Sequence, residues 1–143
     1  MSKLSDIDFS HFEKQSIVNV IIGSNSLLEV EFTAGGLVAE CPWRLQCENK
    51  IMAGSSDSRD VPANVQLKES LIGCQVSEVK FMEEVKMLRI TFSGSIVLDL
   101  FHDSCHFEGW ELYSEDGFTF ISLPEGDFSL QELCTPHGQC REL

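Results

Sequence analysis

Basic side chains are scarce in this sequence. It contains 10 Lys and Arg against 23 Asp and Glu, which gives a net charge of −13, and no Lys or Arg stands between Ile90 and Cys140. Because nucleic-acid binding depends on cations that neutralise phosphates, this balance argues against a DNA or RNA partner. A field of one sign speeds encounter with a basic protein. The alternative is that the acidity only maintains solubility.

Long apolar runs are also missing. The first residues do not combine a basic region with the apolar stretch of about 7 to 15 residues that a secretory signal needs. No later run reaches the about 20 residues of a membrane helix. We therefore expect a cytoplasmic protein with no membrane partner. In that compartment the six cysteines are expected to be free thiols rather than three disulfides.

The motifs of common enzyme classes are absent as well. The sequence has no P-loop, no dinucleotide fingerprint and no serine-centred elbow. Cys105 has histidines on either side, but the carboxylates near it disfavour a thiolate, and no oxyanion-hole motif accompanies it. We expect no enzymatic activity and no catalytic residue.

Histidine and cysteine cluster in two segments, "HDSCH" (102–106) and "CTPHGQC" (134–140). Imidazole nitrogen and thiolate sulfur are the usual zinc ligands, but no pair here has the Cys-x2-Cys spacing of a knuckle. The second segment also lies in a tail, 131–143, that is expected to be flexible. We expect no metal and no cofactor; a β module that binds a metal or small ligand is the alternative function. Its candidate ligands are His102, Cys105, His106, Cys134, His137 and Cys140.

The sequence does contain a duplicated β pattern. Apolar and polar residues alternate in two stretches that end in Phe, which is typical of half-buried strands. Each stretch is preceded by a similar apolar segment and followed by a segment that contains Trp. The matching pairs are "SIVNV" (16–20) with "QVSEV" (75–79), "SLLEVEF" (26–32) with "MLRITF" (87–92), and "PWRL" (42–45) with "GWEL" (109–112).

These matches indicate two copies of a unit of about 60 residues. The copies are expected at about 9–56 and 68–126, within one domain that spans 1–143. Each copy is expected to hold four strands, the third of which carries a Trp, so that the chain has about eight. The turns "TAGG" (33–36) and "SGS" (93–95) supply residues that tolerate positive φ.

A small sheet with one apolar face needs a second layer to cover it. We therefore expect a mainly β fold, α+β at most, in which two antiparallel four-stranded units pack as a sandwich or a half-barrel pair. Trp43 and Trp110 are then equivalent core anchors, and the alternative is that they stack on a ligand.

One short helix is expected between the copies. The segment 64–73 has Asn64 as N-cap and Gly73 as terminator, and it follows a polar linker, 54–64. A single helical turn is expected near 8–14.

The second copy is longer than the first by seven residues between its Phe and its Trp. We expect these residues between Phe101 and Gly109, in an exposed loop that contains "HDSCH". Exposed loops often carry binding residues, so this loop is a candidate for contact with a partner.

Five ordered segments resemble a family of small bacterial proteins, many of which are similar to immunity proteins of polymorphic-toxin or contact-dependent growth inhibition systems. The segments are "DFSHFEKQSIVNVIIGSNSLLEVEF", "VAECPWRL", "LIGCQVSEV", "LRITFSGSIVLDLFHDS" and "GWEL". The resemblance covers about residues 8–123. The chain departs from the family pattern at Glu13-Lys14, where Gly-Lys is common, and in both His/Cys segments, which inherit no role.

The resemblance implies an antitoxin, and the charge is consistent with a basic nuclease as the cognate toxin. Such a protein would bind the toxin and block its active or substrate-binding surface. We expect a monomer or weak homodimer. The candidate partner-binding residues are the acids Asp103, Glu108, Glu111, Glu115, Asp116, Glu125 and Asp127.

Overall fold

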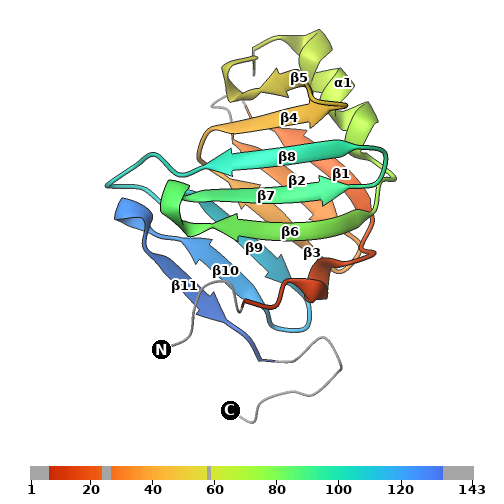
Figure 1. The fold of residues 1–143 in the computed structure, drawn as a ribbon. Helices are drawn as coiled ribbons and strands as arrows, with labels where there is room; N and C mark the ends of the chain where they lie inside the picture. Colours follow the sequence, from red (N-terminus) through yellow and green to blue (C-terminus); the bar gives the residue numbers. More distant parts are fainter. Residues whose placement is uncertain (1–6, 24–26, 58, 134–143) are drawn as a thin grey trace.

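Two antiparallel sheets pack face to face around one apolar core in the computed structural model (Figure 1), which describes residues 7–23, 27–57 and 59–133. The six-stranded sheet has the order β1-β2-β3-β9-β10-β11, and the five-stranded sheet has the order β5-β4-β8-β7-β6. The strands of the first sheet are β1 (Ile17–Ile22), β2 (Leu28–Phe32), β3 (Gly35–Ala39), β9 (Trp110–Ser114), β10 (Thr119–Ser122) and β11 (Phe128–Gln131). Those of the second are β4 (Trp43–Cys47), β5 (Lys50–Gly54), β6 (Val76–Met82), β7 (Met87–Phe92) and β8 (Ile96–Phe101).

Each sheet contains strands from both copies of the repeat. The chain leaves the six-stranded sheet after β3 and enters the other sheet at β4; after β8 it crosses back to form β9. The mainly β fold with one helix is confirmed. The copies differ from the prediction, because each has five strands rather than four and is divided between the sheets. Pro42 stands at the first crossing, between the end of β3 at Ala39 and the start of β4 at Trp43.

The two copies pair their strands in the same way. β1 shifts register by one residue in its pairing with β2, and β6 does the same with β7. Where the copies meet, Ser16 and Gln75 form an antiparallel bridge. The sandwich therefore has a pseudo-twofold relation between its two sheets.

The core anchors are those that the repeat predicts. Trp43 and Trp110 are each 2% exposed, which confirms the interpretation as core residues. Phe12 and Leu71, at equivalent positions before the first strand of each copy, are fully buried. Helix α1 (Val61–Leu71) contacts both β1 and β5, and the 3₁₀ turn η2 (Ser10–Phe12) contacts β6.

The helix begins earlier than the sequence suggested. Its N-cap is Asp60, whose carboxylate accepts a backbone N–H of the first turn, and not Asn64. Pro62 lies in that first turn, where a proline needs no hydrogen-bond partner for its nitrogen. Gly73 follows the helix with a φ of +90°, as expected of a terminator.

The two predicted glycine turns have different outcomes. Gly94, with a φ of +82°, does turn the chain between β7 and β8. Gly35 and Gly36 instead lie inside β3. Small residues are needed there because β9 passes close by: a Cβ on Gly35 would lie 2.2 Å from the backbone oxygen of Tyr113.

The longer second copy has its additional residues in two places. One extends the turn between β7 and β8, and the others lie between β8 and β9. Strand β11 was not predicted, and it follows the 3₁₀ turn η5 (Pro124–Gly126). Two further 3₁₀ turns are η3 (Ser55–Asp57), within the predicted linker, and η4 (Glu83–Val85). In the ranges given above, no helix is long and apolar enough to cross a membrane.

Candidate protein-interaction surface

The two sheets differ in charge. The six strands of the first sheet contain three glutamates and neither Lys nor Arg. The strands of the second sheet carry Arg44, Lys50, Lys80 and Arg89 together with Glu78 and Asp99. The strands of the first sheet thus carry a net charge of −3, from three acids and no base, and those of the second carry +2, from four bases and two acids.

The acidic face is the outer side of the six-stranded sheet around Glu29, Glu31 and Glu111. Glu29 and Glu111 stand on either side of Val38 in one cross-strand row. At about 4.8 Å between strands, their backbones are about 10 Å apart. Because these strands hold no basic residue, their carboxylates keep an unneutralised field that faces outward.

Apolar side chains lie among these carboxylates. Tyr113 is 38% exposed, and its ring lies over Gly36, where a Cβ would come within 2.6 Å of its hydroxyl oxygen. Ile21, 50% exposed, and Val38 line the same shallow hollow of about 240 Å³. An exposed aromatic ring with aliphatic neighbours and a charged surround is typical of protein-binding surfaces.

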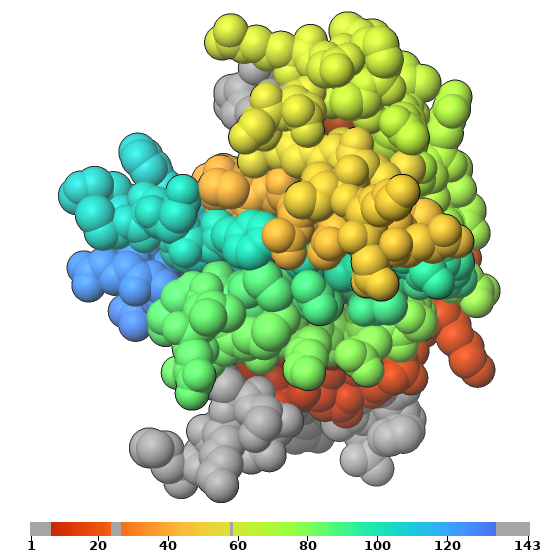
Figure 2. Space-filling model, turned by 45° about the horizontal axis from the view of Figure 1, so that its top comes forward, coloured from red at the N-terminus to blue at the C-terminus, as the bar shows by residue number. Residues whose placement is uncertain are grey.

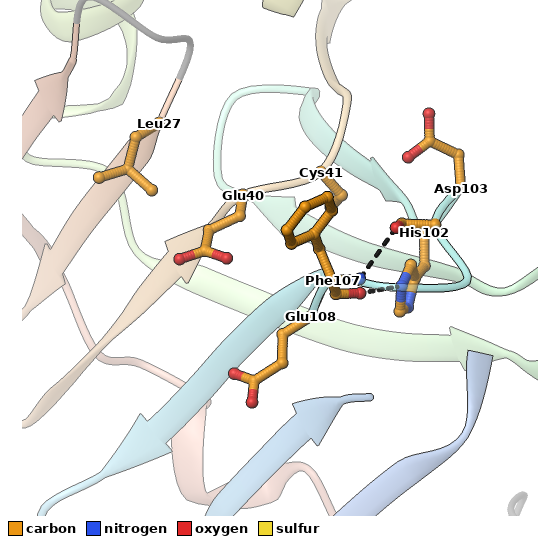
Figure 3. A pocket seen from close by; sticks show the side chains of 8 residues that line it. Leu27, Glu40, Cys41, His102, Asp103, Phe107 and Glu108 are labelled. Carbon is orange, nitrogen blue, oxygen red and sulfur yellow. Dashed lines mark hydrogen bonds between the residues drawn. The ribbon is translucent and has the colours of Figure 1, made fainter. Parts of the chain in front are cut away.

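A second hollow lies at the end of the sandwich where the loop between β8 and β9 projects (Figures 1 and 3). Its volume is about 400 Å³. Phe107, 70% exposed, stands beside it. The lining residues are Leu27, Glu40, Cys41, His102, Asp103, Ser104, Phe107 and Glu108. Glu40 and Glu108 also line a small hollow next to Glu111, so the acidic face continues into this acidic end.

His102 shapes this loop. One of its ring nitrogens, Nδ1, is hydrogen-bonded to the Ser122 hydroxyl, and the other, Nε2, lies 2.9 Å from the Phe107 backbone oxygen. The Ser104 hydroxyl accepts the N–H groups of His106 and Phe107. Both nitrogens of His102 are therefore engaged within the protein and are not free to hold a metal.

The structure describes only three of the six candidate metal ligands. Within the described ranges, no three His, Cys, Asp or Glu side chains come together as metal ligands. Cys134, His137 and Cys140 lie outside those ranges. Cys41, Cys47, Cys74 and Cys105 are free thiols. Burial, with the Asp103 charge as a smaller contribution, raises the pKa of Cys41 to about 12, so this thiol stays protonated in its hollow.

The predicted binding acids lie near both ends of β9, with Glu111 alone on the strand itself. Asp103, Glu108, Glu125 and Asp127 gather at the acidic end, where the Glu125 N–H donates to the Ser104 carbonyl. Glu111 lies on the acidic face. Glu115 and Asp116 lie at the opposite end, in the turn between β9 and β10 (Figure 1). The seven residues therefore do not form one compact cluster.

Asp116 has a structural partner that the sequence did not suggest. The buried ring of His11 places Nδ1 2.5 Å from Asp116 Oδ2 and Nε2 2.7 Å from Glu132 Oε1. Burial alone would lower the pKa of His11, but the hydrogen bonds and charges of the two carboxylates outweigh it and raise the pKa. Through these two contacts the His11 ring joins η2 to the turn between β9 and β10 and to the residue that follows β11. The partners are 105 and 121 positions away, so no local signal could identify them.

Sequence reasoning missed the acids of the first copy. Glu29 and Glu31 share the sheet face with Glu111, and Glu40 lies beside Glu108. The alternation in "SLLEVEF" places both β2 glutamates on the polar side, and this signal could have identified them. They were missed because these glutamates join Glu111 only where β3 of the first copy pairs with β9 of the second, which the sequence does not show.

The chain matches no protein-family model, no curated protein and no solved structure. Its function is therefore inferred from the surface itself.

Proposed function

We propose that this chain is a cytoplasmic immunity protein, which binds a basic toxin domain and blocks its active or substrate-binding surface without chemistry of its own. A nuclease is the toxin class that fits, because its substrate-binding surface must attract phosphates. The observation that carries the proposal is the segregation of charge between the sheets. The resemblance to immunity proteins supports it independently.

Glu29, Glu31 and Glu111 would take the places of phosphates on the toxin. Carboxylates in an unneutralised row meet Lys and Arg with complementary potential, which raises the association rate and rejects acidic partners. Tyr113, between them, would supply the aromatic contact that such interfaces use as an energetic centre.

The acidic face is smaller than the area that a stable protein interface buries. Six strands at about 4.8 Å spacing and five residues at about 3.3 Å each cover about 24 by 17 Å, or about 400 Å². A stable interface buries about 800 Å² on each partner. The toxin would therefore also contact the acidic end, including Asp103, Glu108 and Phe107.

The test is binding to the toxin domain encoded beside this gene, measured by calorimetry with charge-reversal variants. Glu29→Lys with Glu111→Lys should weaken binding at least about 100-fold, because close interfacial charge pairs contribute several kcal/mol. Glu69→Lys with Glu78→Lys is the matched control: it makes the same change in net charge on α1 and β6 and should leave the affinity within about threefold. Equal weakening by both pairs would show that only net charge matters, and no weakening by either would contradict the proposed face.

A further inference from the structure

A buried carboxylate organises the outer side of the five-stranded sheet. Asp99, at the middle of β8, is fully buried beneath the side chains of its two cross-strand neighbours. Arg89 donates to it through Nε at 2.7 Å and Nη2 at 3.0 Å, and Arg44 donates through Nη2 at 2.8 Å. Burial would raise the pKa of Asp99, but these hydrogen bonds and charges lower it, so Asp99 is ionised. Two cations share one anion, which leaves one positive charge.

Asp99 uses only some of the donors of the two guanidinium groups. Each group has five N–H bonds, of which Arg44 uses one and Arg89 two on Asp99. The Nε of Arg44 is buried and finds no acceptor in the part of the chain that the structure describes, so the donors that can reach a ligand are the Nη groups. Both side chains are about one-third exposed, at 34% and 37%. The Arg44 guanidinium also lies over the Phe101 ring, 5.1 Å from its centroid, as in a cation–π contact.

These arginines line a cavity of about 520 Å³. The turns of the β4–β5 and β7–β8 hairpins wall it at one end of the sheet, on the right in Figure 1, and Figure 2 views this side of the molecule. The Glu48 N–H donates to the Ser95 carbonyl at 3.2 Å and ties the two turns together. The other lining residues are Gln46, Asn49, Ser95 and Val97. Because Gln46 Nε2 donates to Asp99 at 3.3 Å, the additional donors are the Asn49 amide and the Ser95 hydroxyl.

The fold does not require this ion cluster. In the other sheet the equivalent positions hold Glu29, Val38 and Glu111, and the strands pair there in the same way without a buried charge. A buried ion pair adds little stability compared with apolar residues of similar volume. The cluster is therefore better explained by what it presents to the cavity than by the stability of the sheet.

We propose that this cavity binds the phosphate or carboxylate group of a small molecule. Asp99 holds two guanidinium groups in place, so that their free edges form the paired donors that such groups accept. The Glu48 carboxylate also lines the cavity and offsets the one positive charge of the cluster, so recognition rests on the paired donors and not on net charge. The acids of the opposite face are screened, because they lie beyond the Debye length of about 8 Å at physiological salt. The inference is independent of the proposed function, since it uses the other sheet.

The test is an NMR titration of the full chain that follows the Nε–Hε signals of Arg44 and Arg89. The probes are inorganic phosphate, acetate and chloride at equal ionic strength. We expect saturable shifts with phosphate or acetate and only small linear shifts with chloride. The phosphate and acetate arms distinguish the two sources of the oxyanion. Linear, equal responses to all three anions would overturn the proposal.

Two variants and one matched control make the result specific. Arg89→Gln should weaken binding about tenfold or more, as the loss of charged hydrogen bonds implies. Asn49→Gly with Ser95→Gly removes both side-chain donors, suits the positive φ of these positions (67° and 63°) and leaves the ion cluster in place. It should also weaken binding, which keeps the test valid if Arg89→Gln unfolds. Lys80→Gln, the neighbour of Arg89 on β6 outside the cavity, removes the same charge and should bind normally. Equal loss in Lys80→Gln would reduce the effect to net charge and overturn the site.

Discussion

Glu29 and Arg89 occupy the same place in the two copies of the repeat and carry opposite charges on opposite sides of the sandwich. Glu29 lies across from Val38, and Arg89 lies across from Asp99. The duplication thus produces two sheet faces that are alike in strand pairing and opposite in charge. One face is suited to a basic partner and the other to a small anion.

Asp99→Val should destabilise the protein by about 3 kcal/mol, because it leaves Arg44 and Arg89 side by side without a shared anion. Combining it with Arg44→Gln and Arg89→Gln should restore most of that loss, since no unpaired cation remains. Urea unfolding of the single and triple variants measures both effects. A single variant as stable as the wild type would show that the guanidinium groups simply turn to solvent.

The contribution of His11 should depend on pH. Because its pKa is raised in the folded state, the stabilisation is complete below the unfolded value of about 6.5 and is lost as the pH rises through the folded pKa. His11→Gln should therefore cost about 1.5 to 3 kcal/mol at pH 6 and clearly less at pH 9. Urea unfolding at the two pH values measures this difference. An equal cost at both would mean that the ring is held as a neutral group.

Neighbouring glycines in β3 should respond differently to the same substitution. A Cβ on Gly35 meets the backbone of Tyr113 and Ser114, which cannot move without breaking the β3–β9 pairing, so Gly35→Ala should cost about 3 kcal/mol or more. At Gly36 the nearest atoms belong to the mobile ring of Tyr113, and a cost of about 1 kcal/mol is expected. Chemical denaturation distinguishes them; equal costs would contradict the close approach of β9.

The cysteines should differ in reactivity. Cys41 is buried and has a pKa of about 12, so at pH 8 only about one thiol in ten thousand is ionised, and the thiolate is the reactive form. Cys105 is exposed. Iodoacetamide labelling followed by peptide mapping should modify Cys105 in the folded protein and Cys41 only after unfolding. Rapid labelling of Cys41 without denaturant would show that its hollow opens to solvent.

Periodicity predicted much of the fold for a physical reason. Alternating side chains decide which face of a strand is buried, so the two strand patterns and the buried Trp43 and Trp110 could be recognised locally. The exchange of strands between sheets could not, because it depends on where the chain crosses, at Pro42 and in the loop that follows Phe101. Gly35 was misassigned to a turn because its need for space comes from a distant strand.

The candidate surface was predicted in part. The run without basic residues indicated Glu111 and the acids of the loop, but Glu29 and Glu40 join them only through pairing between the copies. Asp116 was predicted to be free for a partner, yet it accepts a hydrogen bond from His11. Its replacement would thus disturb the fold as well as any interface, which makes Glu111 the better residue to change.

The salt dependence of toxin binding tests the acidic face most directly. If the proposed toxin partner is encoded by a neighbouring gene, its affinity for the wild-type chain should fall steeply between about 50 and 200 mM salt, since exposed charge pairs are screened over that range. For Glu29→Lys with Glu111→Lys, the affinity should be lower at 50 mM and the slope much shallower. A wild-type affinity that does not change with salt, or a variant with the same slope, would contradict the assignment of this face to a basic partner.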